Sequence, residues 1–217
     1  MPELKDFKKT WKTNLASSNF RLRFLFTFLL LGIVIRMLTW YLVYNEHREG
    51  VVLDDPILKI ITAVNLNIPI FALIYVSLIV GLITLAFTPE WLLIAIQTYS
   101  LTVIFRIILM YVTPLDVPHG SIDLEDPLVF VLGTGGLKLT RDLFFSGHTS
   151  TLFILSLTSR SKKLKYIFLI STILVGIFVM LQKVHYSVDV FVAPFVAYSS
   201  FKIILLLNRN NKNIQIV

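Results

Sequence analysis

The stretch LNIPIFALIYVSLIVGLITLAF, residues 66–87, decides the fold, because it is long, apolar and free of charged residues. An α-helix needs about 20 such residues to cross the hydrocarbon core of a bilayer. Working outward, further apolar runs occur at 22–44, 91–113, 143–158, 166–182 and 187–207, of which 143–158 and 166–182 are short. We therefore predict six transmembrane helices.

The composition agrees with a membrane protein. The chain has 217 residues and a mean hydropathy of +0.78, with 56% hydrophobic and 15% charged residues. Soluble domains have about a quarter of their residues charged. The absence of cysteine excludes a disulfide framework and thiolate chemistry. We predict an all-α membrane protein with no second domain.

The basic residues predict how the helices are oriented. If six helices alternate in direction, thirteen Lys and Arg residues share one side: Lys5, Lys8, Lys9, Lys12, Arg21, Arg23, Arg160, Lys162, Lys163, Lys165, Lys202, Arg209 and Lys212. The opposite connections hold five: Arg48, Lys59, Lys138, Arg141 and Lys183. Loops rich in Lys and Arg stay cytoplasmic, so we predict an N-in/C-in topology. This pattern explains the net charge of +7 without a nucleic-acid partner.

Three regions follow from this pattern. Residues 1–20 form a basic cytoplasmic segment, in which 5–17 has the character of an amphipathic helix lying on the inner leaflet. Residues 21–207 form the membrane domain, and 208–217 form a cytoplasmic tail. Residues 54–64 are expected to include a short interfacial helix, because two aspartates precede Pro56.

Two imidazoles and one carboxylate lie beside the predicted outer ends of the spans. FSGHT, residues 145–149, holds His148, and HYSVD, residues 185–189, holds His185 and Asp189. Residues four apart on a helix share one face, so Asp189 can orient His185 and leave its other nitrogen as a nucleophile or base. Gly147 permits close approach of a ligand, and free amides beside Ser146 attract anions.

These motifs resemble the type 2 phosphatidic acid phosphatase (PAP2) superfamily, and most closely its sphingomyelin synthase branch. RIILMYVTPLDVP, residues 106–118, is similar to that branch's R-x-x-x-M-Y-V-T-x-L-P-V-P. DLFFSGHT, residues 142–149, is similar to G-D-Y-L-F-S-G-H-T, and HYSVDV, residues 185–190, to H-Y-T-V-D-V. LDD, residues 53–55, corresponds weakly to P-L-P-D. The resemblance implies a PAP2-like helical bundle.

The resemblance also implies a reaction that needs no cofactor and no metal. A glycerophospholipid would donate phosphocholine or phosphoethanolamine to the hydroxyl of a ceramide-like lipid, releasing diacylglycerol. His185, oriented by Asp189, would carry the head group as a phosphohistidine, and His148 would act as general acid and then as general base.

The chain departs from the phosphatase branch in its basic motifs. No Arg-Pro dipeptide occurs, and Phe178-Val179 stand where Ser-Arg would precede His185. A phosphodiester carries one negative charge fewer than a phosphomonoester, so a less basic site suits it. Against the synthase pattern, Arg141 replaces a glycine and Asp116 replaces a proline. These changes affect which head group the site would accept and leave the expected reaction unchanged.

Further residues are candidates for substrate binding. Arg106 and Arg141 would offset negative charge on the phosphoryl group, beside Ser146 and Gly147. An ammonium head group would be received by carboxylates and aromatic rings, for which the candidates are Asp54, Asp55, Asp142, Tyr111 and Tyr186.

Three alternatives stay open. The phosphohistidine would be resolved by water in a phospholipase C-type or PAP2-like hydrolase. Buried His, Asp and Arg also occur in transporters and proton relays. A facial metal triad of His148, His185 and Asp189 is a third arrangement. The predicted site faces the extracytoplasmic side of a bacterial inner membrane or of a eukaryotic Golgi or plasma membrane, and the oligomeric state is not predicted.

Overall fold

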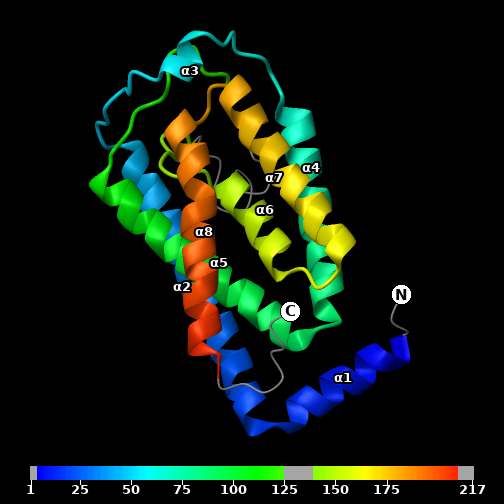
Figure 1. The fold of residues 1–217 in the computed structure, drawn as a ribbon. Helices are drawn as coiled ribbons and strands as arrows, with labels where there is room; N and C mark the ends of the chain where they lie inside the picture. The colour runs from blue at the N-terminus through cyan, green and yellow to red at the C-terminus, as the bar shows by residue number, and fades with distance from the viewer. Residues whose placement is uncertain (1–3, 125–138, 210–217) are drawn as a thin grey trace.

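The computed structural model describes residues 4–124 and 139–209, which form eight helices (Figure 1). These are α1 (Leu4–Ala16), α2 (Ser18–Glu46), α3 (Pro56–Lys59), α4 (Asn67–Ala86), α5 (Pro89–Val112), α6 (Gly147–Thr158), α7 (Lys162–Leu181) and α8 (Ser187–Leu207). The predicted amphipathic helix is α1, and the predicted interfacial helix is the single turn α3. Lys138, Lys212 and most of the predicted tail 208–217 lie outside the described residues.

Five helices, α2, α4, α5, α7 and α8, are long and apolar enough to cross a membrane. The prediction of six transmembrane helices needs a correction at the fourth, the short run 143–158. α6 has 12 residues, because residues 143–146 of the predicted span are not helical. At 1.5 Å per residue, such a helix is only about 18 Å long. The long apolar helices indicate an integral multi-pass membrane protein.

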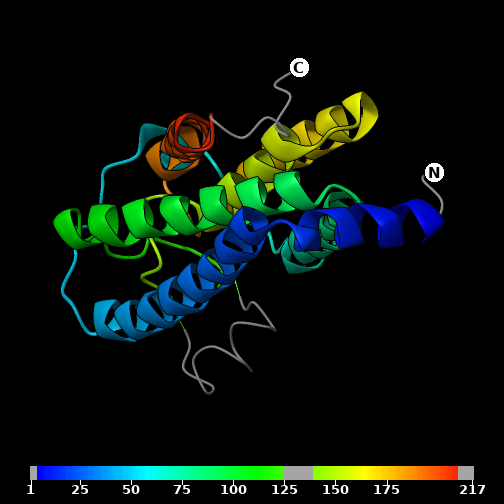
Figure 2. The same cartoon turned by 90° about the horizontal axis from the view of Figure 1, so that it is seen from below.

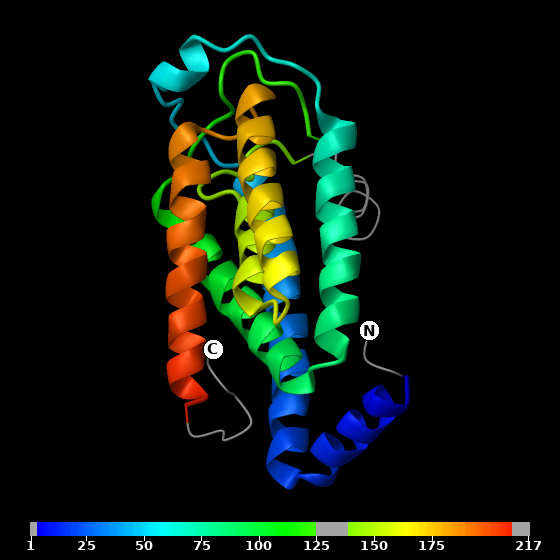
Figure 3. The same cartoon turned by 45° about the vertical axis from the view of Figure 1, so that its right-hand side comes forward.

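The short helix α6 lies inside the bundle. It packs against α4, α5, α7 and α8, as Figure 3 shows for the neighbouring α7 and α8. Leu152 and Leu155 of α6 enter one apolar core with Ile94 of α5 and Val175 of α7. Because the neighbouring helices cover α6, its first residues are held at a fixed depth below the outer connections.

The helices begin at residues suited to that position. Ser17, Ser146 and Ser161 cap α2, α6 and α7, and each serine hydroxyl accepts a hydrogen bond from a backbone N–H in the first turn. Pro89 lies in the first turn of α5, where its missing N–H costs no helical hydrogen bond. These local signals explain why the chain reverses direction where it does.

The two ends of the bundle differ in structure. At one end α1 leaves α2 at an angle and is fastened by its Trp11 Nε1–H, which donates to the carbonyl of Ala86 at 2.8 Å (Figure 2). The other end is covered by α3 and the long connections (Figure 1). There Val51 N–H donates to the carbonyl of Pro114, and Asp116 N–H donates to that of Val51, both at 3.0 Å. The α2–α4 and α5–α6 connections are therefore joined by a short parallel bridge.

Candidate active site

His185 and Asp189 form a buried pair at the start of α8. The His185 Nδ1 atom lies 3.2 Å from Asp189 Oδ2, and the two residues are 3% and 0% exposed. The same oxygen accepts the backbone N–H of Tyr186, the N-cap residue of α8, at 3.2 Å. A carboxylate only accepts hydrogen bonds, so the hydrogen of the neutral imidazole lies on Nδ1 and the Nε2 lone pair is free for chemistry.

The second histidine is brought to this pair by a backbone contact. Ser146 N–H donates to the carbonyl of Asp189 at 3.2 Å, which joins the first turn of α6 to the first turn of α8. The His148 and His185 rings then lie 6.5 Å apart between centroids, at an angle of 64°. The edge of the imidazole of His148 meets the ring of Phe71 from α4. Within the described residues, His148, His185 and Asp189 do not form a metal-holding cluster.

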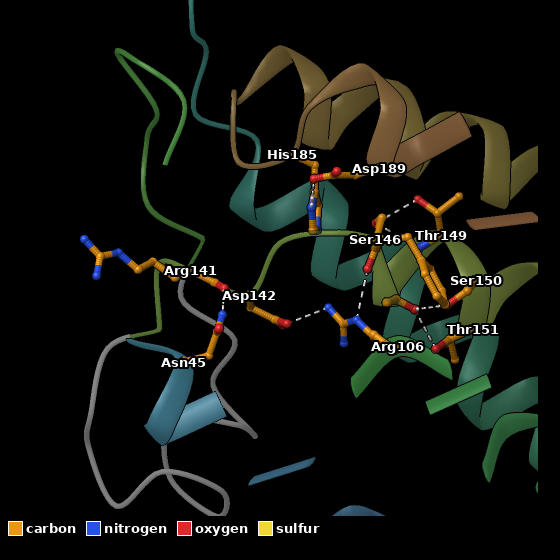
Figure 4. A network of polar contacts seen from close by, with 12 residues as sticks. Asn45, Arg106, Arg141, Asp142, Ser146, Thr149, Ser150, Thr151, His185 and Asp189 are labelled. Atoms are coloured by element: carbon orange, nitrogen blue, oxygen red, sulfur yellow. Dashed lines mark hydrogen bonds and ion pairs between the residues drawn. The ribbon is translucent and has the colours of Figure 1, made fainter. Parts of the chain in front are cut away.

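Arg106 of α5 lies beside the first turn of α6 (Figure 4). Its Nε donates to the carbonyl of Phe145 at 3.0 Å, and its Nη2 pairs with Asp142 Oδ1 at 2.7 Å. A Cβ atom placed on Gly147 would lie 2.4 Å from Arg106 Nη1. Glycine at 147 is therefore what lets the guanidinium lie against this turn. Arg106, Asp142, Ser146 and Gly147 lie together, and their predicted contacts with a substrate stay predictions.

Arg141 takes part in a separate network. Its Nε and Nη2 atoms hold both carboxylate oxygens of Asp116, at 3.1 and 3.0 Å, and its Nη1 donates to the carbonyls of Glu46 and Arg48. In Figure 4 its side chain extends away from Arg106. The structure thus places the Arg141 guanidinium on a protein carboxylate, and its predicted role at the phosphate stays a prediction.

Asp55 and Tyr186 fasten the outer connections to α8. Asp55 Oδ2 accepts the N–H of Ser187 at 2.7 Å, and its Oδ1 accepts the N–H groups of Ile57 and Leu58 as the cap of α3. The buried Tyr186 hydroxyl donates to the carbonyl of Asp116 at 2.9 Å and accepts the N–H of Leu53. Both side chains hold the segment next to His185.

Two predicted head-group residues lie elsewhere on the outer surface. Asp54 is exposed and forms an ion pair with Lys59. Tyr111 is 59% exposed, and its ring lies 5.2 Å from the Arg48 guanidinium carbon. Their predicted contact with an ammonium group stays a prediction.

Sequence reasoning missed two residues that hold the outer connections. Glu46 accepts the N–H groups of Thr140 and Arg141 at 2.9 and 3.0 Å, which fixes the segment that leads into α6. The buried Gln182 side chain accepts the N–H of Leu66 and donates to Asn67 and to the carbonyls of Ile122 and Asp123. Glu46 and Gln182 are polar residues beside the end of an apolar run. Many polar residues have this placement, so the sequence gives no signal that distinguishes these two.

Two carboxyl groups outside the spans have shifted pKa values. Burial raises the pKa of Asp55, but the N–H groups of Ser187, Leu58 and Ile57 stabilise the anion more, so the pKa lies below its ordinary value. Burial likewise opposes ionisation of Asp116, and the Val117 N–H and Arg141 outweigh it and lower the pKa. Folding therefore favours the ionised form of both groups.

This shift predicts the acid sensitivity of the outer connections. A lowered pKa contributes stability that is present above the ordinary carboxyl pKa of 3.8 and is lost as the pH falls through the lower folded value. We expect the melting temperature of the protein in detergent micelles to fall as the pH is lowered below about 4. The slope should be shallower in Asp55→Asn, and an unchanged slope would contradict the assignment.

Gly147→Ala should displace the Arg106 guanidinium. We expect a loss of about 1–3 kcal/mol in the free energy of unfolding, because the methyl group overlaps Nη1. Gly32→Ala is the matched control, since a Cβ atom there meets no atom within 4 Å. Thermal unfolding of both variants in the same detergent measures the difference, and equal stability of the two would refute this packing argument.

Comparison with known families matches one part of the chain. Residues 141–205 match the sequence model of the family described as PAP2 superfamily C-terminal. The match contains His148, His185 and Asp189 and ends within α8. No curated protein matches the chain. Residues 141–205 are therefore similar to the PAP2 superfamily C-terminal domain.

Proposed function

We propose that the protein is a membrane-embedded lipid phosphotransferase that works through a phosphohistidine on His185. The buried pair of His185 and Asp189, with His148 across from it, is the observation that carries the proposal. The PAP2 superfamily domain supports an enzyme that acts on lipid phosphates. The donor we propose is a glycerophospholipid, and the acceptor is a ceramide-like lipid.

In the first step, the Nε2 lone pair of His185 forms a bond to the phosphorus of the donor. The bond from phosphorus to the diacylglycerol oxygen breaks, and its electron pair stays on that oxygen. Protonated His148 donates a proton to the oxygen, so diacylglycerol leaves as an alcohol and His148 becomes neutral. The Asp189 carboxylate stabilises the imidazole as its Nε2 gains a bond, because Nδ1–H points at it.

In the second step, the hydroxyl oxygen of the acceptor attacks the phosphorus. Neutral His148 takes the hydroxyl proton, and the nitrogen–phosphorus bond breaks with its electron pair returning to Nε2. Both histidines are then in their starting states. The separation of 6.5 Å between ring centroids supports this scheme, because it brings both histidines close enough to act on one phosphoryl group.

The charge of the site supports a phosphodiester as the group that is attacked. Arg106 lies beside Gly147 at the start of α6, with one of its nitrogens paired to Asp142. The ion pair of Arg106 and Asp142 has no net charge. It therefore attracts a phosphate dianion less strongly than an unpaired guanidinium would. A phosphocholine or phosphoethanolamine diester carries a single negative charge and suits this arrangement.

We propose that the bundle crosses the membrane six times with both termini in the cytoplasm. α6 runs in the same direction as α4 and α8 (Figure 3). The fourth crossing is therefore made by α6 together with the non-helical residues before it. The histidines then lie on the extracytoplasmic side. The basic residues of α1 and of the α6–α7 turn lie on the cytoplasmic side, as expected from their charge.

A transfer assay tests the reaction. Purified protein in liposomes is incubated with labelled ceramide and a panel of phosphatidylcholine and phosphatidylethanolamine, and the products are identified by mass spectrometry. We expect a new phosphosphingolipid and an equal amount of diacylglycerol. Release of free phosphocholine or phosphoethanolamine without a new sphingolipid would instead identify a hydrolase.

Variants of the two histidines test the mechanism. His185→Ala and His148→Ala should each lower turnover at least about a hundredfold, because one removes the nucleophile and the other the general acid and base. His47→Ala is the matched control, since its ring contacts only the carbonyl of Val43 among the described residues. Full transferase activity in His185→Ala would overturn the phosphohistidine route.

Single cysteines test the topology, because the natural chain has none. We expect an impermeant maleimide added outside intact cells to label Asp54→Cys and to leave Lys12→Cys and Lys163→Cys unlabelled until the membrane is opened. Labelling of Lys163→Cys from outside would contradict the proposed orientation.

A further inference from the structure

A hollow lies at the end of the bundle opposite the histidines. It occupies about 420 Å³ between α1, the first turns of α2, the α4–α5 turn and Arg160 in the α6–α7 turn. A further hollow along α1 shares its lining residues Thr10, Thr13 and Asn14 and also reaches Asp6 and Lys9. This inner cavity has no part in the phosphoryl transfer described above.

Two arginines from distant parts of the chain line the inner cavity. Arg23 of α2 pairs with Glu90 of α5 through Nη1 at 2.9 Å, and its buried Nη2 has no hydrogen-bond partner among the described residues. The Arg160 guanidinium carbon lies 4.7 Å from the centroid of the Trp91 ring. Glu90 is the one acidic residue of the lining, so the lining carries one excess positive charge.

The rest of the lining is polar and small. Hydroxyl groups come from Thr10, Thr13, Ser17 and Thr88, and amides come from Asn14 and Asn19. Arginines surrounded by hydroxyl and amide donors are the usual surroundings of a bound phosphate. The volume lies within the range of small-ligand sites, which is about 300–1,000 Å³. The chemistry of the cavity is therefore that of a site for a phosphate-bearing anion.

We propose that the inner cavity binds the phosphate of an anionic phospholipid head group. Trp11 and Trp91 lie at this end of the spans, where tryptophan is enriched at the membrane interface. Lys8, Lys9 and Lys12 are exposed on α1 and attract anionic lipids to the same surface. Binding itself does not depend on the transferase activity. The placement in the inner leaflet rests on the N-in topology proposed above.

Native mass spectrometry of the full chain in detergent tests the proposal. Phosphatidic acid is compared with phosphatidylcholine, and glycerol 3-phosphate serves as the soluble phosphate. We expect retention of phosphatidic acid at least about tenfold above phosphatidylcholine, with no retention of glycerol 3-phosphate. Tighter binding of glycerol 3-phosphate than of phosphatidic acid would overturn the lipid as the source of the phosphate.

Variants locate the binding. Arg160→Gln and Arg23→Gln should each weaken the retention of phosphatidic acid about tenfold, because each removes a charge-assisted hydrogen bond. Glu90→Gln should strengthen the retention of phosphatidic acid, because the substitution removes the negative charge of the lining. If Arg23→Gln fails to fold, Glu90→Gln still tests the site.

Two controls separate this site from other causes. Lys12→Gln removes one positive charge from α1 outside both hollows and should change retention less than twofold. His185→Ala should bind as the natural chain does, which separates this site from the catalytic one. An equal loss in Lys12→Gln and Arg160→Gln would show diffuse attraction to α1 and would overturn the proposal.

Discussion

The structure of the site depends on the buried Asp189. Its carboxylate holds the His185 Nδ1 atom and the Tyr186 N–H, and its backbone carbonyl accepts the N–H of Ser146. The partners of the buried carboxylate both lie at the start of α8, so it fixes the orientation of His185 there, whereas the backbone carbonyl joins this turn to the first turn of α6. The backbone contact between Ser146 and Asp189, with the packing of α6 against α8, sets the separation of the two histidines.

Charges beside the spans are neutralised in pairs, and each pair joins distant segments. Arg106 and Asp142 join α5 to the segment before α6, Arg141 and Asp116 join the two halves of the long outer connection, and Arg23 and Glu90 join α2 to α5. Because desolvated charges are costly when unpaired, these contacts specify which segments lie together.

The outer connections work as a framework for His185. Asp55 accepts the N–H of Ser187, and the Tyr186 hydroxyl bridges Leu53 and Asp116. The bridge between Val51 and Leu115 joins the same two connections. The sequence predicts that Asp55 and Tyr186 contact the head group of the substrate. In the structure their side chains form hydrogen bonds with backbone N–H and carbonyl groups. Spacing in the sequence shows that such residues are near the site and does not show which way they point.

The sequence by itself determined the helical class, most of the spans and the pairing of His185 with Asp189, because these depend on local periodicity and on a spacing of four residues. Tertiary structure decided the short length of α6, the approach of His148 to His185, the capture of Arg141 by Asp116 and the inner cavity. Each of these joins residues far apart in the chain. The physical reason is that buried polar groups must find partners, and only the packed bundle decides which partners are within reach.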